Sequence, residues 1–265
     1  MERPTVHLPV PRSLAAANVL VFVTVMVANG TAGAGTLSGE SIGLIANRYP
    51  SYFLPANWVF GIWSLIYLGL LLFTLYQAVP RGRRSEAVAR MGWAWALNGA
   101  LNVAWVVTFS FSMFLTAWAI MIVLLVNLVW LNERIGLGIR RLTVVDRLFV
   151  AYPFALYLAW ISVALISNTF QLVTYLNWGG FGVPGPVWSA AMITAGTGLA
   201  TFMVVHRGNW LFPLVFAWAF WGLADRYVDV GLIAGCARVG AIGVLVLMVA
   251  GIARRRSRTQ VTTEA

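Results

Sequence analysis

The sequence has few charges for its length: only 10% of its 265 residues are charged, and none of them is lysine. A soluble domain usually carries about 25% charged residues, so this chain lacks the groups needed to cover a surface that faces water. Hydrophobic residues make up 60% of the chain, and its mean hydropathy is +0.82. The composition therefore excludes an ordinary soluble domain and predicts an integral membrane protein.

Cysteine and histidine are scarce as well. The single cysteine is Cys236, and the two histidines, His7 and His206, lie far apart in the sequence. This excludes a disulfide framework and a cysteine-based metal site, and we expect neither a metal site nor a required cofactor. The sequence contains no HExxH motif, no P-loop and no carboxylate pair within an apolar stretch, which makes a classical enzyme the weaker hypothesis.

Long apolar stretches dominate what remains. A membrane-spanning helix needs about 20 mostly apolar residues, because the hydrocarbon layer is about 30 Å thick. Stretches of this kind predict an all-α fold, namely a polytopic membrane helical bundle. We identify eight of them, at residues 13–33, 57–79, 91–111, 113–131, 148–168, 187–205, 210–224 and 230–252.

The arginines are distributed unevenly between the two sides of such a bundle. With eight spans, 15 of the 18 arginines fall on the side that holds both termini. Only Arg48 and Arg226 fall on the opposite side, and Arg238 lies inside the last stretch. Because cytoplasmic loops carry an excess of arginine and lysine, we expect both termini to be cytoplasmic, in a bacterial cytoplasmic membrane. The net charge of +10 is then a topology signal rather than a sign of nucleic-acid binding.

Aromatic and amide side chains recur at helical spacing in three of the stretches. An unpaired amide is costly in hydrocarbon, and a tryptophan in the middle of a span needs an acceptor for its N–H. The three stripes should therefore face one another, either around a ligand cavity or in a packed seam held by interhelical hydrogen bonds. The stripes consist of Phe60, Trp63 and Tyr67; of Trp95, Asn98, Asn102, Trp105 and Phe109; and of Tyr157, Trp160, Ala164 and Asn168.

All of these residues except Trp95 and Asn98 lie in three motifs that appear in a consistent order. The motifs are FLPANWVFGIWSLIY at residues 53–67, ALNVAWVVTF at residues 100–109 and LYLAWISVALISN at residues 156–168. Together they resemble the signatures of the tryptophan-rich sensory protein/translocator protein family, the relatives of the peripheral-type benzodiazepine receptor. The resemblance covers about residues 13–170, and the chain continues well beyond it.

The resemblance implies a five-helix membrane core with a pocket that opens toward the loop after the first helix. It also implies a receptor or carrier with a sensory or regulatory role. Its ligand would be a porphyrin or haem, or an isoprenoid or sterol-like lipid. The loop at residues 34–56 would act as a lid. The ligand-binding residues expected from the stripes and the resemblance are Trp58, Phe60, Trp63, Tyr67, Asn98, Asn102, Trp105, Phe109, Tyr157, Trp160 and Asn168.

The chain beyond the motifs suggests three parts. We expect a core at residues 1–170, additional transmembrane helices packed on it at residues 171–253, and a basic cytoplasmic tail at residues 254–265. A charge inside a span is costly, so Arg238 is expected to form an ion pair with Asp229 or Asp225, to extend toward the loop that holds them, or to contact an anion. Membrane lipid and the hydrophobic ligand are the expected partners, and the sequence leaves a homodimer open.

Two other hypotheses compete with a receptor or carrier. An intramembrane enzyme that modifies a tetrapyrrole or isoprenoid could use acidic residues of the C-terminal stretches. A scaffold protein would instead have a fully packed seam and would bind nothing. A cavity between the second, third and fifth stretches would distinguish the receptor from the scaffold.

Overall fold

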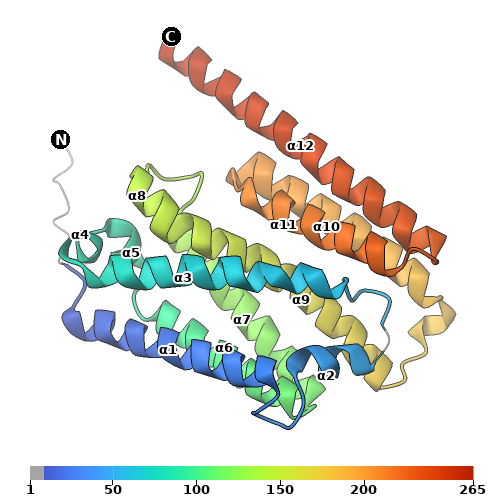
Figure 1. Ribbon diagram of the computed structural model, residues 1–265. Helices are drawn as coiled ribbons and strands as arrows, with labels where there is room; N and C mark the ends of the chain where they lie inside the picture. The colour runs from blue at the N-terminus through green and yellow to red at the C-terminus, as the bar shows by residue number, and fades with distance from the viewer. Residues whose placement is uncertain (1–8, 50, 265) are drawn as a thin grey trace.

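The protein is built from helices, and the part of the chain that the structure describes contains no strand (Figure 1). The computed structural model describes residues 9–49 and 51–264, with side chains through residue 254. The prediction of an all-α polytopic bundle is confirmed. Its long helices are α1 (Arg12–Ala34), α3 (Ile62–Ala78), α6 (Ala94–Ser110), α7 (Phe114–Ile135), α9 (Tyr152–Tyr175), α10 (Gly185–Arg207), α11 (Leu211–Arg226) and α12 (Gly231–Glu264).

Short helices lie in the connections, where the sequence had suggested only loops. α2 crosses the loop after α1, and the 3₁₀ turn η1 leads directly into α3. The connections on the opposite side of the bundle contain α4, α5 and α8. The bounds are α2 (Ile42–Arg48), η1 (Asn57–Gly61), α4 (Pro80–Arg83), α5 (Glu86–Met91), α8 (Val144–Asp146), the π-helical turn η2 (Arg147–Ala151) and η3 (Gly180–Gly182).

All eight predicted apolar stretches are helical. Six helical segments within the described residues are long and apolar enough to cross a membrane. The other two, α6 and α11, have 17 and 16 residues, which at 1.5 Å per residue gives only about 25 Å. Length alone therefore supports six spans, and the two shorter helices lie among longer neighbours.

Helix ends follow from local sequence. α1 ends at Gly35, whose φ is +78°, a conformation that glycine adopts at little cost. A Cβ at this position would lie 3.0 Å from the Ser41 backbone nitrogen, so the chain also needs glycine for space. α6 and α7 form an antiparallel hairpin through a turn at Ser112, as the sequence predicted.

The most buried span of the bundle is α9. About 67% of its apolar window is buried, against 28–39% for the other candidate spans. α7 and α3, from the N-terminal part of the chain, pack along α9, and so does α11 from the C-terminal part. α1 packs on α6 and α3. The core therefore runs continuously through α9, and its buried aromatic residues include Trp95, Phe154 and Phe216.

The C-terminal helices α10, α11 and α12 pack against one another beyond α9. α12 continues as a helix through Glu264 and projects past its neighbours in Figure 1. Residues 254–264, expected as a polar tail, are thus a continuation of this helix. The division into a core at 1–170 and additional helices at 171–253 stays a prediction.

The two ends of the bundle differ in their connections. We call the end that carries α2 and η1 the α2 side, and the end that carries α4, α5 and α8 the arginine-rich side (Figure 1). Arg90, Arg134 and Arg207 all lie near the arginine-rich side. His7 lies outside the described residues, and His206 lies one residue before the end of α10.

Candidate functional site

A cavity of about 710 Å³ lies at the α2 side of the bundle. This volume falls within the range of about 300–1,000 Å³ found for small-molecule sites. Its walls come from α1, α2, the segment leading into α3, α3 itself, α6 and α9. The lining residues include Met26, Asn29, Gly30, Gly33, Ser41, Ile42, Gly43, Leu44, Ala46, Asn47, Ser51, Leu54, Pro55, Asn57, Phe60, Trp63, Tyr67, Trp105, Phe109, Trp160, Ala164, Ser167, Asn168 and Gln171.

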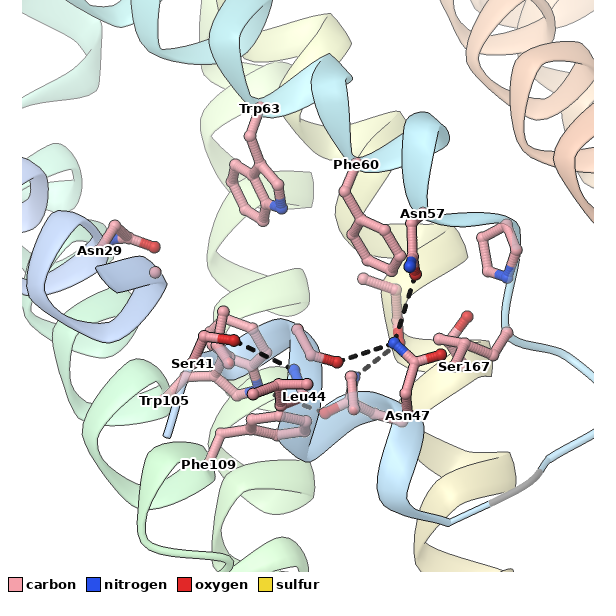
Figure 2. Close-up of a pocket in the computed structure, with 18 of the residues that line it drawn as sticks. Asn29, Ser41, Leu44, Asn47, Asn57, Phe60, Trp63, Trp105, Phe109 and Ser167 are labelled. Carbon is pink, nitrogen blue, oxygen red and sulfur yellow. Dashed lines mark hydrogen bonds between the residues drawn. The ribbon is translucent and has the colours of Figure 1, made fainter. Parts of the chain in front are cut away.

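Aromatic rings form the walls on the side of α3 and α9. Trp63 and Tyr67, four residues apart on one face of α3, stack with ring centroids 5.2 Å apart. The ring of Trp160 on α9 meets Trp63 edge-on at 6.1 Å and Phe60 edge-on at 5.8 Å. Figure 2 shows Trp63 and Phe60 reaching from α3 and η1 into the cavity. The first and third predicted stripes therefore converge.

The second stripe supplies a further part of the lining. Trp105 and Phe109 project from α6, with ring centroids 5.3 Å apart, and lie beneath α2 in Figure 2. The Trp105 indole N–H donates to the Asn168 side-chain oxygen at 3.2 Å, which joins α6 to α9. Both residues are buried, and α2 covers them from the α2 side.

The side of α1 is lined differently, because two of its four lining residues are glycines. Gly30 and Gly33 line the cavity, and a Cβ built on either would meet no atom within 4 Å. Asn29, next to them, donates its amide to Asn102 Oδ1 at 2.8 Å, and its own oxygen points toward the cavity in Figure 2. This wall is smooth and has room for a ligand against the helix.

The polar groups of the lining are amides and hydroxyls, and no charged side chain is among the described lining residues. Asn47 on α2 donates to Gly43 O at 2.7 Å and to Asn57 Oδ1 at 3.3 Å, which links α2 to η1 (Figure 2). Gln171 on α9 donates to Ile45 O at 3.3 Å. These bonds hold α2 as a cover over the cavity.

One polar atom in the wall lacks a partner. Trp160 is only 2% exposed, and its indole Nε1 forms no hydrogen bond within the structure. Leaving a buried donor unsatisfied costs about 1–3 kcal/mol. Because this atom has almost no accessible surface, the N–H lies beneath the ring surface that lines the cavity and is not open to a ligand there.

Segment 51–59 forms another part of the lining and is held by the C-terminal helices. Tyr227, after α11, donates its hydroxyl to Ser51 O, and Ala56 N donates to Gly222 O at 3.0 Å. Trp218 Nε1 donates to Val59 O at 3.0 Å. Burial raises the pKa of the Tyr227 hydroxyl, which favours its protonated, donating form. The C-terminal helices thus position one wall of the cavity.

Four of the predicted site residues are not part of the cavity lining. Asn102 donates to the Tyr157 hydroxyl at 2.8 Å, behind the wall. Asn98 donates to Asn127 Oδ1 at 2.9 Å, between α6 and α7. Trp58 is 42% exposed and donates to Asp225 Oδ2 at 2.9 Å. The other seven predicted residues, Phe60, Trp63, Tyr67, Trp105, Phe109, Trp160 and Asn168, all line it.

Arg238 and Asp229 are not brought together. Both are exposed, and the ion pairs among the side chains that the structure describes join Glu40 to Arg48, Glu86 to Arg90 and Glu133 to Arg207. The reason is geometric: Asp229 precedes α12, whereas Arg238 lies about two helical turns into it.

Sequence reasoning missed several lining residues. Gln171 and Ser167 extend the α9 stripe at eleven and seven residues beyond Trp160, so continuing the helical periodicity would have found them. Asn29 lies beside the glycines of α1, and the small residues around it are only a weak indication that it lines a cavity. Asn47 and Asn57 come from a connection whose path the sequence does not specify.

The fold and the site define an integral membrane protein whose helices enclose an aromatic, uncharged cavity of ligand size. The chain belongs to the TSPO-like protein family, whose model matches residues 15–250. The match includes most of the C-terminal helices, and it extends beyond the three motifs. Searches of curated proteins and of solved structures gave no match. The family indicates a membrane protein of the receptor or transporter type.

Proposed function

We propose that the protein is a receptor or carrier that binds a flat hydrophobic ligand in the cavity at the α2 side. A porphyrin is the first candidate, and an isoprenoid or sterol-like lipid is the second. The observation that carries this proposal is the cavity itself, whose walls are formed largely by aromatic rings and which is of ligand size. A sensory or regulatory role would follow if ligand binding changes the position of α2.

The chemistry of the lining supports a planar apolar ligand. The rings of Trp63, Tyr67, Trp105 and Trp160 offer faces and edges for stacking. The smooth wall of Gly30 and Gly33 provides space opposite them. A rigid ring system would bury apolar area here without losing much conformational entropy.

The lack of charge in the lining limits how such a ligand would be oriented. A carboxylate is costly to bury without a charged partner. The carboxylates of a porphyrin would therefore remain at the water-facing end, and the macrocycle would enter first. Neutral donors of the ligand would meet the Asn29 oxygen. The described lining residues include no histidine or cysteine, so Met26 and Tyr67 are the lining side chains of a kind that can ligate haem iron.

The same lining gives less support to an intramembrane enzyme. Carboxylate, imidazole and thiol groups, which usually carry acid–base and nucleophilic chemistry, are missing from the described lining residues. Asp225 bonds to Trp58 outside the cavity. No specific observation favours a reaction at this site, and binding is the function that its geometry supports best.

The test is quenching of tryptophan fluorescence by protoporphyrin in detergent-purified protein. Trp160→Phe replaces the ring that meets Trp63 and Phe60 edge-on with a smaller one, and we expect about fivefold weaker binding, or about 1 kcal/mol of lost ring contact. Trp63→Ala removes a stacking wall and should weaken binding further. Trp130→Phe, at an exposed position on α7, is the control. Equal affinity in all four proteins would disprove the pocket assignment.

Both termini are proposed to be cytoplasmic, because the arginine-rich side would then face the cytoplasm. Cysteine labelling in intact cells tests this orientation. In a Cys236→Ala background, one variant carries a single cysteine at exposed Leu44 on α2, and another carries one at Ile139 on the arginine-rich side. An impermeant reagent should label the Leu44 position from outside and not the Ile139 position. The reverse pattern would show the opposite orientation.

A further inference from the structure

A second cavity, of about 310 Å³, lies at the arginine-rich side between α7, α9, α10 and the start of α11. It shares no lining residue with the cavity under α2. Its lining is Leu125, Val129, Asn132, Glu133, Leu137, Ile139, Leu158, Ser162, Leu199, Phe202, Met203, Arg207, Asn209 and Phe212. The proposed ligand site leaves this cavity without a role.

The walls of the second cavity are apolar and lie partly on the outer surface of the bundle. Val129 on α7 is 45% exposed, and Leu199 and Phe202 on α10 are 42% and 47% exposed. In a membrane, an apolar surface at this position on two spanning helices faces acyl chains. The cavity is therefore a groove open to lipid, and we call it the α7–α10 groove.

The polar end of the α7–α10 groove is an ion pair. Arg207, the last residue of α10, donates from Nη1 to Glu133 Oε2 of α7 at 2.8 Å, and both side chains are partly exposed. The two amides nearby are each engaged on one side: Asn132 donates to Phe154 O and Asn209 accepts from Phe212 N. An arginine has five N–H donors, so Arg207 can bind a further anionic group while it keeps Glu133.

The dimensions match one leaflet of a bilayer. Eight residue steps, a rise of about 12 Å, separate Leu199 from Arg207 on α10. The same rise separates Leu125 from Glu133 on α7. Half of the hydrocarbon layer is about 15 Å. An acyl chain that lies along the groove would thus place its headgroup at the level of Arg207.

We propose that the α7–α10 groove binds one phospholipid of the membrane leaflet on the arginine-rich side. One acyl chain lies between α7 and α10, and the phosphate accepts hydrogen bonds from Arg207. The lateral opening favours a bilayer lipid over a soluble anion, and the remaining donors of Arg207 favour a headgroup that carries a phosphate. The bound lipid would join the core helices to the C-terminal helices. This site is independent of the proposed porphyrin site.

The test uses the full-length protein in detergent, with phosphatidylglycerol as the probe and native mass spectrometry to measure bound lipid. Val129→Trp fills the groove and Arg207→Gln removes the phosphate donor. We expect each to weaken binding of the first phosphatidylglycerol about tenfold. The matched controls are Val126→Trp and Arg134→Gln, and both should bind phosphatidylglycerol as wild type does. Val126 is exposed on the same helix outside the lining, and Arg134 stacks on Trp130.

Glu133→Gln separates a lipid site from a purely structural ion pair. Without the carboxylate, Arg207 is fully available, so phosphatidylglycerol should bind more tightly than in wild type. Weaker binding in Glu133→Gln, or equal binding in Val129→Trp and Val126→Trp, would overturn the proposal. Competition by inorganic phosphate alone would also overturn it, because the acyl chain would then not contribute. Protoporphyrin affinity, measured in parallel, should be the same in all these variants.

Discussion

The two cavities of this protein lie at opposite ends of the same bundle and have opposite chemistry. The α2-side cavity is larger, about 710 against 310 Å³, and is walled by rings, glycines and amides without a charged side chain. The α7–α10 groove is mostly aliphatic and ends at the Glu133–Arg207 ion pair. Under the two proposals, shape and stacking would select the ligand at the α2 side, whereas an arginine and an apolar groove would select it at the arginine-rich side.

The largest expected effect comes from filling the α2-side cavity. Gly33 lines it and has open space beyond its Cα, so Gly33→Leu should place a side chain where the ligand would lie. We expect protoporphyrin binding, measured by fluorescence quenching, to weaken at least about thirtyfold, while phosphatidylglycerol binding is unchanged. The thirtyfold figure corresponds to about 2 kcal/mol.

Gly198→Leu is the matched control for this substitution. Gly198 is also a helical glycine with open space, but it lies on α10 outside both linings. Gly198→Leu changes the helix propensity in the same way as Gly33→Leu does. The protoporphyrin affinity of Gly198→Leu should therefore equal that of wild type. Equal loss in the two leucine variants would mean that the effect is not local to the cavity.

Raising the salt concentration should change the affinities of the two sites differently, by a smaller factor than Gly33→Leu does. Ionic interactions at exposed positions are screened as the Debye length falls from about 10 Å at 0.1 M to about 3 Å at 1 M. Phosphatidylglycerol binding at the α7–α10 groove should weaken severalfold over this range, and protoporphyrin binding should change little. Salt-sensitive protoporphyrin binding would indicate that charged groups hold the ligand and would contradict the uncharged site.

Loosening one wall of the α2-side cavity should have a modest effect. Tyr227→Phe removes the hydroxyl that donates to Ser51 O and accepts from Leu54 N. We expect faster amide exchange in residues 51–56 and about two- to fivefold weaker protoporphyrin binding, the range for a single hydrogen bond. Tyr175→Phe, at an exposed position after which α9 ends, should change neither. Unchanged exchange in Tyr227→Phe would show that this wall does not depend on the C-terminal helices.

The smallest effect is expected at Trp58. Its ring packs edge-on against Trp218, 4.7 Å between centroids, outside the cavity. Trp58→Phe should leave protoporphyrin affinity within about twofold of wild type, less than the effect of one hydrogen bond. A loss as large as that of Trp63→Ala would place Trp58 in the binding site and would contradict the described geometry.

The fold was largely predictable because apolar length and arginine distribution encode membrane helices directly. The predicted stretches coincide with the long helices, and the turn at Ser112 joins α6 and α7 as expected. Helical spacing also identified the converging rings, since residues three or four apart share a face. The short helix α2 was missed because its seven residues depend on contacts such as Gln171 with Ile45 O, which are remote in sequence.

The site was only partly predictable because periodicity gives a face but not what that face meets. Asn102 and Trp105 belong to one stripe, yet Trp105 lines the cavity and Asn102 bonds Tyr157 behind it. Trp58 belongs to a motif, but η1 turns it toward Asp225. The α7–α10 groove depends on how α10 packs beside α7, and no local pattern in either helix records that arrangement.

The most direct test of the central claim is hydrogen–deuterium exchange of the full-length protein with and without protoporphyrin. The account predicts slower exchange in α2 and in residues 51–57, which cover and line the α2-side cavity, and no change at the arginine-rich ends of α7 and α10. Protection confined to α7 and α10, or none in α2 at saturating ligand, would contradict a receptor site beneath α2.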